Sequence, residues 1–84
     1  MIKKEIIFPY HLFNRRAAEL SQALLRQEMR YCYLEREGKR ANGKSLLGLL
    51  SLGAKQGEVV TLICEDKEGI VKMEEIINNL KEVL

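Results

Sequence analysis

Residues 42–53, NGKSLLGLLSLG, form the stretch of sequence that decides the fold. Serine favours the N-cap of a helix, and glycine favours the position just past its end. The stretch therefore predicts a short, almost wholly apolar helix over residues 46–52, capped by Ser45 and closed by Gly53. So short a helix cannot bury all five of its leucines on one side, so we expect some of them to form an exposed apolar patch. The alternative is burial on both sides by neighbouring loops.

The segment before this helix predicts a β-hairpin. Residues 29–37 alternate with a period of two, and Glu37-Gly38 supplies a turn into residues 39–42. Side chains two residues apart lie on the same face of a strand. One face therefore holds Cys32 and Leu34, and the other holds Tyr31 and Tyr33.

The segment after the short helix predicts a strand and a last helix. Residues 58–65 alternate again, with Val60, Leu62 and Cys64 on one face. Asp66 is suited to cap the helix that follows. Its apolar residues recur at close to 3.6 residues and predict an amphipathic element of about 17 residues. They are Ile70, Met73, Ile76 or Ile77, Leu80, and Val83 or Leu84.

The N-terminal part of the sequence predicts a first strand and a first helix. The strand covers residues 2–8, and Pro9 ends it because proline offers no ladder donor. After a loop over residues 9–13, Asn14 is a good N-cap for a helix over residues 15–27. The inward face of this helix is predicted to hold Ala17, Leu20, Ser21 and Leu24.

These elements predict one α+β domain over residues 1–84. Their order is β-α-β-β-α-β-α. Strand runs joined by a tight turn pair antiparallel, and helices can cover one face of such a sheet while the other stays open. Tyr31 and Tyr33 are then expected on the uncovered face.

Composition and charge exclude several classes of function. The 14 basic and 12 acidic residues are spread along the chain and leave a net charge of +2, so no basic tract points to nucleic acid. No stretch approaches the roughly 20 apolar residues of a membrane span, and no signal peptide is evident, so we expect a cytoplasmic protein. Cys32 and Cys64 stand singly, which favours buried side chains over a metal site. No cofactor is indicated.

Residues 38–45, GKRANGKS, match the phosphate-binding pattern G-x-x-x-x-G-K-S. The chemistry of that loop needs a buried parallel strand before it, a long helix after it and a distant acidic residue for the metal. Here Gly38 fits a hairpin turn, and the helix that follows is under three turns. We therefore interpret the motif as a turn followed by a cap, and we do not expect an enzyme.

The same region resembles the HPr family of phosphocarrier proteins. The resemblance rests on Gly38-Lys39, on residues 42–53 and on residues 56–62, QGEVVTL, and it extends over essentially the whole chain. It implies the family's open-faced β-sandwich, in which three helices cover one face of a four-stranded antiparallel sheet. The order of elements predicted above agrees with this fold.

The phosphoryl-accepting histidine of the family is missing. Aligned without gaps, the run NRRAA that begins at Asn14 falls on the family's His-x-Arg-Pro-Ala motif. An amide has no nucleophilic nitrogen that can hold a transferable phosphoryl group, so we expect no relay through this position. Arg16 keeps the arginine of the motif, Ala17 replaces its proline, and Leu12 stands where the family has glycine. His11, the only histidine, is expected to be a solvent-facing loop side chain.

Ser45 matches a second functional position of the family. In HPr of low-GC Gram-positive bacteria, and in its histidine-less relative Crh, the corresponding serine is phosphorylated by HPr kinase. A phosphate on Ser45 would meet the unpaired amides and the positive dipole end of the short helix. The alternative is that Ser45 serves only as an N-cap.

The resemblance also implies a surface that docks partner proteins. Arg15 and Arg16 oppose the dipole of the first helix, and with the free amides after Asn14 they form a candidate anion site. Surface arginines without a role are the alternative. Besides these two arginines, the expected partner contacts are Leu46, Leu47 and Leu50.

These residues together suggest a Crh-like regulator. HPr kinase would modify Ser45, and the domain would then bind a LacI-type catabolite repressor without touching nucleic acid or membrane itself. Crh keeps a Gln-Ala-Arg-Pro run, which this chain alters at three of four positions. Two alternatives therefore remain: a divergent interaction module of the same fold that is never phosphorylated, and a residual component of the phosphotransferase system. A monomer or a weak homodimer is expected.

Overall fold

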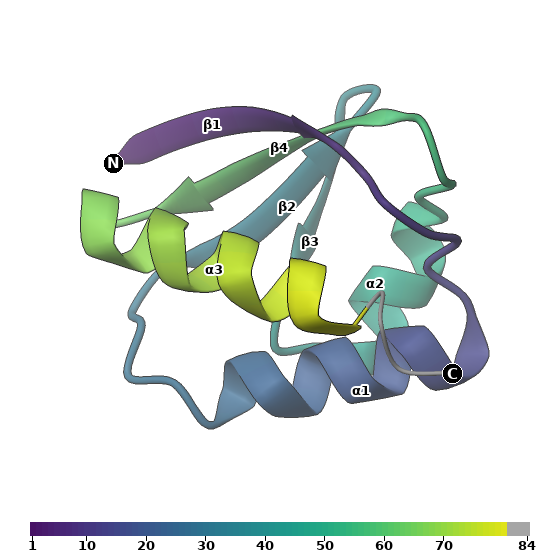
Figure 1. Ribbon diagram of the computed structural model, residues 1–84, viewed down its shortest axis with the longest axis horizontal. Helices are drawn as coiled ribbons and strands as arrows, with labels where there is room; N and C mark the ends of the chain where they lie inside the picture. Colours follow the sequence, from purple (N-terminus) through teal and green to yellow (C-terminus); the bar gives the residue numbers. More distant parts are fainter. Residues whose placement is uncertain (81–84) are drawn as a thin grey trace.

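The computed structural model describes residues 1–80 and shows a four-stranded antiparallel sheet with three helices (Figure 1). This confirms the predicted order of elements and the fold class. The elements are β1 (Ile2–Ile7), α1 (Asn14–Leu25), β2 (Cys32–Arg36), β3 (Lys39–Asn42), α2 (Leu46–Leu52), β4 (Val59–Cys64) and α3 (Lys67–Leu80).

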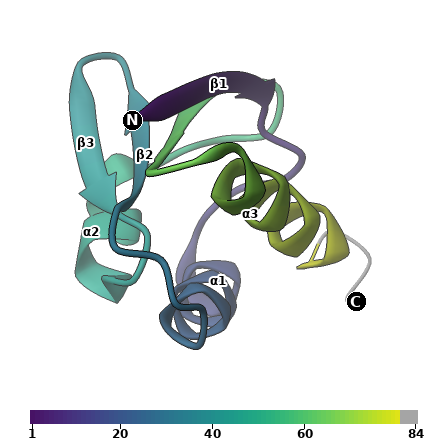
Figure 2. The same cartoon turned by 90° about the vertical axis from the view of Figure 1, so that its left-hand side faces the viewer.

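The sheet has the strand order β1-β4-β2-β3, and every neighbouring pair is antiparallel. The last strand in the sequence, β4, therefore lies between β1 and β2. Figure 2 shows the helices gathered on one side of the sheet, with α1 between α2 and α3. The other face of the sheet carries no helix in the described part of the chain.

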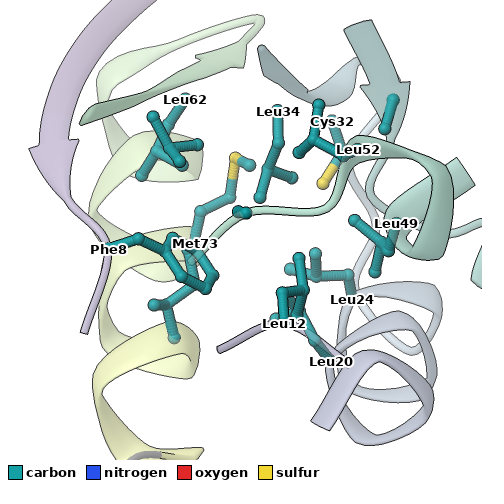
Figure 3. Close-up of a cluster of buried hydrophobic side chains, with 14 of the residues drawn as sticks. Phe8, Leu12, Leu20, Leu24, Cys32, Leu34, Leu49, Leu52, Leu62 and Met73 are labelled. Atoms are coloured by element: carbon teal, nitrogen blue, oxygen red, sulfur yellow. The ribbon is translucent and has the colours of Figure 1, made fainter. Parts of the chain in front are cut away.

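The core lies between the sheet and the helices (Figure 3). Strands give it the alternate residues that their pattern predicts, such as Leu34 and Leu62, which are directly opposite each other in the β2–β4 register. The buried residues of α1 are the four predicted ones. In α2 the buried leucines are Leu49 and Leu52, and in α3 the buried apolar side chains are Ile70, Met73 and Ile77.

Two features of the sheet differ from simple alternation. Ile63 is fully buried although it lies on the open face, where its register partners are Lys3 and Tyr33. Its position in a central strand explains this, because side chains from both neighbouring strands can lean over it. The second strand also begins later than the predicted residue 29. The Glu65 carboxylate accepts hydrogen bonds from the N–H groups of residues 30 and 31, which holds that segment as a loop.

The sequence predicts the N-cap correctly for two of the three helices. Ser45 and Asp66 cap α2 and α3, and Gly53 (φ 62°) closes α2. At α1 the prediction is wrong, because Phe13 takes the N-cap position and Asn14 is already the first helical residue. The last helix is described to Leu80, so Val83 and Leu84 lie outside the described residues. None of the helices in residues 1–80 is long and apolar enough to cross a membrane.

Candidate functional site

Ser45 is the N-cap of α2, and its hydroxyl accepts a hydrogen bond from the first turn of the helix. The backbone at Ser45 is extended (φ −108°, ψ 114°), and its Oγ accepts a hydrogen bond from the N–H of Gly48 at 3.0 Å. The absence of a side chain at Gly48 gives this contact room, because a Cβ there would lie 3.2 Å from the Ser45 Oγ. Ser45 is half-buried, so part of its side chain meets solvent.

A tight turn before Ser45 fixes its position. The Asn42 side-chain oxygen accepts from the N–H of Lys44 at 2.9 Å, and the Asn42 carbonyl accepts from the N–H of Ser45 at 2.9 Å. The Lys44 ammonium donates to the Met29 carbonyl at 2.6 Å. Lys44 thus ties the start of α2 to the loop that follows α1, and its charge is directed to that loop.

The segment that matches the phosphate-binding pattern does not form a phosphate loop. Strand β3 occupies the middle of the motif, and Gly38 (φ 79°) closes the hairpin turn. A phosphate would need the backbone N–H groups of this segment. Those of Gly43 and Ser45 instead donate to the carbonyls of Cys32 and Asn42. The prediction of a turn followed by a cap is confirmed.

Three leucines of α2 form an exposed apolar surface directly after Ser45. Leu47 is 77% exposed, Leu46 40% and Leu50 38%, whereas Leu49 and Leu52 point into the core. The predicted exposure of some of these leucines is confirmed, and burial on both sides is wrong. We call Leu46, Leu47 and Leu50 the α2 patch. Adjacent exposed leucines of this kind mark an interaction surface more often than isolated ones do.

An ion pair holds the far end of α2 against the sheet. Arg36 donates to both carboxylate oxygens of Glu58, at 2.9 and 3.2 Å, and to the Leu52 carbonyl at 3.0 Å. The hydrogen bonds from Arg36 lower the pKa of Glu58, and the same pairing raises the pKa of Arg36. A planar guanidinium fits a carboxylate with two parallel bonds, so this contact fixes orientation as well as distance. The α2 patch is therefore presented by a helix anchored at both ends.

The start of α1 lacks any comparable cap. Phe13 occupies the N-cap position (φ −122°, ψ 155°), and within the described residues no side chain caps the helix. Asn14 is exposed and has φ 40°, in the left-handed region that asparagine tolerates better than most residues. This backbone turn starts the helix one residue earlier than predicted. The Asn14 side chain therefore does not cap the helix.

The two arginines of the predicted anion site point in different directions. Arg15 is exposed, with its Nε 3.8 Å from the Glu19 carboxylate. Arg16 lies 4.8 Å from the centre of the Tyr10 ring and donates to the Leu80 carbonyl at the end of α3. Arg16 thus lies between α1 and α3, whereas α2 is on the other side of α1 (Figure 2). The anion site expected from these arginines and the amides after Asn14 stays a prediction.

Tyr10 supports the position of Arg16. Its ring packs edge-on against Phe8, with the ring centres 5.0 Å apart. Burial raises the pKa of the Tyr10 hydroxyl, so the group stays protonated at neutral pH. Among the residues that the structure describes, none makes a hydrogen bond to this hydroxyl. Tyr10 therefore acts through the face of its ring, on which the guanidinium rests.

His11 and Phe13 form an exposed ring pair that sequence reasoning missed. The His11 ring stacks on Phe13 with the centres 5.5 Å apart, and its Nδ1 lies 3.5 Å from the Gln56 N–H. Leu12 donates its N–H to the Ala54 carbonyl at 2.8 Å, so the loop before α1 lies beside the C-terminal end of α2. The expected solvent exposure of His11 is confirmed. The sequence signal for this pair was an aromatic residue, Phe13, placed just before the predicted helix.

Comparisons with known proteins agree with the fold. The family model described as the PTS HPr component phosphorylation site matches residues 3–83. The HPr-like protein Crh of Halalkalibacterium halodurans is 40% identical over 45 residues, which cover 54% of this chain and 54% of that protein. The match thus spans about half the length of this curated relative.

Solved structures are similar over nearly the whole chain. HPr-C-His from Thermoanaerobacter tengcongensis has a TM-score of 0.81 and 29% identity, and the match covers 96% of each chain. Crh from Bacillus subtilis has a TM-score of 0.69 and 31% identity, and the match covers 100% of this chain and 95% of that one. The Crh crystal structure reveals a swapping domain in an intertwined dimer.

Proposed function

Because the chain belongs to the HPr family, we propose that it is a Crh-like regulator that is switched at Ser45 and docks a partner through the α2 patch. One observation carries this proposal: a partly exposed serine hydroxyl directly precedes exposed leucines on a firmly anchored helix. The partner we propose is a LacI-type catabolite repressor. In this account the protein works in the cytoplasm by binding and does not catalyse a reaction.

A phosphate on Ser45 would change the charge at the edge of an apolar surface. It adds close to two negative charges and three strong acceptor oxygens beside the first amides of α2. That position is favourable by about 0.3–1 kcal/mol, so the helix is expected to persist. A partner with a basic side chain next to an apolar pocket would then distinguish the phosphorylated form from the free one.

The start of α1 supports the loss of histidine relay. Asn14 offers an amide, which cannot carry a transferable phosphoryl group. Arg16, the arginine that the motif retains, is engaged by the Leu80 carbonyl and the Tyr10 ring. Both observations favour a regulatory role centred on α2 over a carrier role centred on α1.

Incubation with HPr kinase and ATP tests the switch. We expect the intact mass to rise by one phosphate, and fragmentation to place the phosphate on Ser45. The Ser45→Ala variant should stay unmodified, while Ser51→Ala, a change at an exposed serine of the same helix, should be phosphorylated like the unaltered protein. An unmodified Ser45, in a reaction that fully modifies an ordinary HPr, would contradict the proposal.

Titration of a purified LacI-type repressor tests the docking surface. We expect Leu47→Ser to weaken binding of the phosphorylated protein at least tenfold, because a buried leucine contact is worth more than about 1.4 kcal/mol. Leu25→Ser is the matched control, since Leu25 is 62% exposed on α1. Equal effects of the two changes would exclude the α2 patch. Equal affinity of phosphorylated and free protein would favour the constitutive interaction module.

A weak homodimer is a second proposal. The Crh structure, which this chain matches over its full length, is an intertwined dimer. Within residues 1–80, β1 is an edge strand that pairs only with β4, so exchange of β1 between two copies would preserve its register. Light scattering across a concentration series should then show a mass that rises with concentration. A constant monomer mass would contradict the dimer and leave the regulatory proposal intact.

A further inference from the structure

Two cysteines that the proposed function does not use lie on neighbouring strands in the core. Cys32 is the first residue of β2 and Cys64 the last residue of β4, and the register places them directly opposite each other. Both are buried, and both are free thiols. They occupy neighbouring strands, although 31 residues separate them in the chain.

The type of strand pairing at this position fits a disulfide. The Cys32 carbonyl accepts a hydrogen bond from the N–H of Gly43 at 2.7 Å, so it points to the side away from β4. Opposed residues that share no ladder bond have Cα atoms about 4.5 Å apart, which falls within the roughly 4.4–6.8 Å spanned by disulfides. Both residues also lie at a terminus of their strands, where the backbone can adjust.

The two sulfurs now occupy spaces that glycines leave open. A Cβ at Gly43 would lie 2.9 Å from the Cys32 Sγ, and one at Gly69 would collide with the Cys64 Sγ. The Cys64 thiol also donates to the Glu65 carboxylate at 3.0 Å. To form a bond, the sulfurs have to rotate about their Cα–Cβ bonds towards the other strand, and the Cys64 thiol has to give up its hydrogen bond to Glu65.

We propose that Cys32 and Cys64 form an intramolecular disulfide when the protein meets a peroxide. One S–S bond replaces two S–H bonds, so the thiols give up two electrons and two protons. Hydrogen peroxide accepts them and becomes two molecules of water.

The bridge would fasten the segment that carries the α2 patch. It joins β2 to β4 and closes the chain around β3 and α2, so this segment cannot separate from β4. Burial raises the pKa of both thiols, to about 12 for Cys32, where proximity of Cys64 adds to the effect. Since the thiolate is the reactive form, oxidation is slow at neutral pH and accelerates as the pH rises.

Treatment of the native, full-length protein with hydrogen peroxide tests this proposal. We expect the thiols that react after denaturation to fall from two per chain to none, and the mass to drop by two hydrogen atoms. A peptide that links Cys32 to Cys64 should appear on digestion without reductant. The Tm should rise by about 10 °C, because a bridge across a loop of this length restricts the unfolded chain, and dithiothreitol should reverse the rise.

Single variants provide the controls. Cys32→Ser and Cys64→Ser each retain one thiol and should show no intramolecular bridge and no rise in Tm. Cys32→Ala and Cys64→Ala repeat the test without a buried hydroxyl, in case the serine variants fold poorly. Oxidation of each thiol singly to a sulfinic acid, bridges only between chains, or two unchanged thiols in native protein after prolonged treatment at raised pH would overturn the proposal.

Discussion

The starts of α2 and α3 are built alike, and the start of α1 is built differently. Ser45 Oγ and Asp66 Oδ1 each accept a hydrogen bond from the N–H of a glycine three residues further on, at 3.0 Å from Gly48 and 2.8 Å from Gly69. This is the standard arrangement of an N-cap. At α1 the cap position is held by a phenylalanine, the next residue has a positive φ, and two arginines follow.

This difference bears on our proposal of a regulatory role centred on α2. A site that breaks local rules of stability is often functional. By the ungapped alignment, the start of α1 falls where the HPr family has its phosphoryl-accepting histidine; Asn14 offers an amide there, and Arg16 contacts α3. The start of α2 has a side-chain cap and adjoins exposed leucines. In our proposal, the functional helix start is that of α2.

The largest expected difference in stability is between alanine substitutions at the starts of α3 and α2. Gly69→Ala should cost about 2–3 kcal/mol of stability, because the added methyl group would collide with Cys64 in the core. Gly48→Ala should change stability by less than about 1 kcal/mol, since the nearest neighbours of its Cβ would be Ser45 and Ala41 at 3.2 Å or more and alanine favours the helix. Urea unfolding of both variants measures the difference. Equal losses would contradict it.

The next largest difference in stability is expected between substitutions of Arg16 and Arg15 in α1. Arg16→Met should lower stability by about 1.5 kcal/mol, because it removes the hydrogen bond to Leu80 and the contact with the Tyr10 ring. Arg15→Met should stay within about 0.5 kcal/mol of the unaltered protein, as expected for an exposed side chain. Chemical denaturation of the pair checks this order. A larger loss at Arg15 would show that the wrong arginine has been assigned to the α1–α3 contact.

A smaller effect is expected at the cap of α2. Ser45→Ala should cost about 1 kcal/mol, because the Gly48 N–H then loses its acceptor. Ser51→Ala, at an exposed position of the same helix, should have almost no effect. Thermal unfolding of the two variants gives the comparison. If they behave alike, the hydroxyl of Ser45 does not act as a cap in solution.

The smallest expected change in stability is an acid response at Glu65, which lies just before α3. Hydrogen bonds, foremost from the N–H of Arg30, lower the pKa of Glu65 to about 2. A depressed carboxyl pKa contributes stability above the unfolded value of about 4.3, and this contribution is lost as the pH falls towards 2. The Tm of the unaltered protein should therefore fall over this range more than that of Glu65→Gln. Parallel curves for the two proteins would contradict the assignment.

Sequence reasoning succeeds where a structure is decided by neighbours in the chain. The helix over residues 46–52, its cap at Ser45 and its split between buried and exposed leucines all follow from local preference and helical geometry. It fails at α1 because the backbone of Asn14 follows a loop that Leu12 ties to Ala54, far away in sequence.

Local sequence patterns also could not predict the partner of Arg16 or the burial of Ile63. Arg16 meets the Leu80 carbonyl 64 residues away, and the motif gives no hint of that contact. Ile63 alternates as an open-face residue should, but its place in a central strand buries it. Both features depend on which elements become neighbours after folding.

The central claim is that no phosphoryl group can be relayed at the start of α1. Phosphoenolpyruvate and the general phosphotransferase enzyme, with an ordinary HPr in the same reaction as a positive control, test it directly. We predict that the control becomes phosphorylated while residues 10–16 of this chain carry no acid-labile phosphate. Phosphate on His11, or on any other residue from Tyr10 to Arg16, would contradict the account and make the protein a working component of the phosphotransferase system.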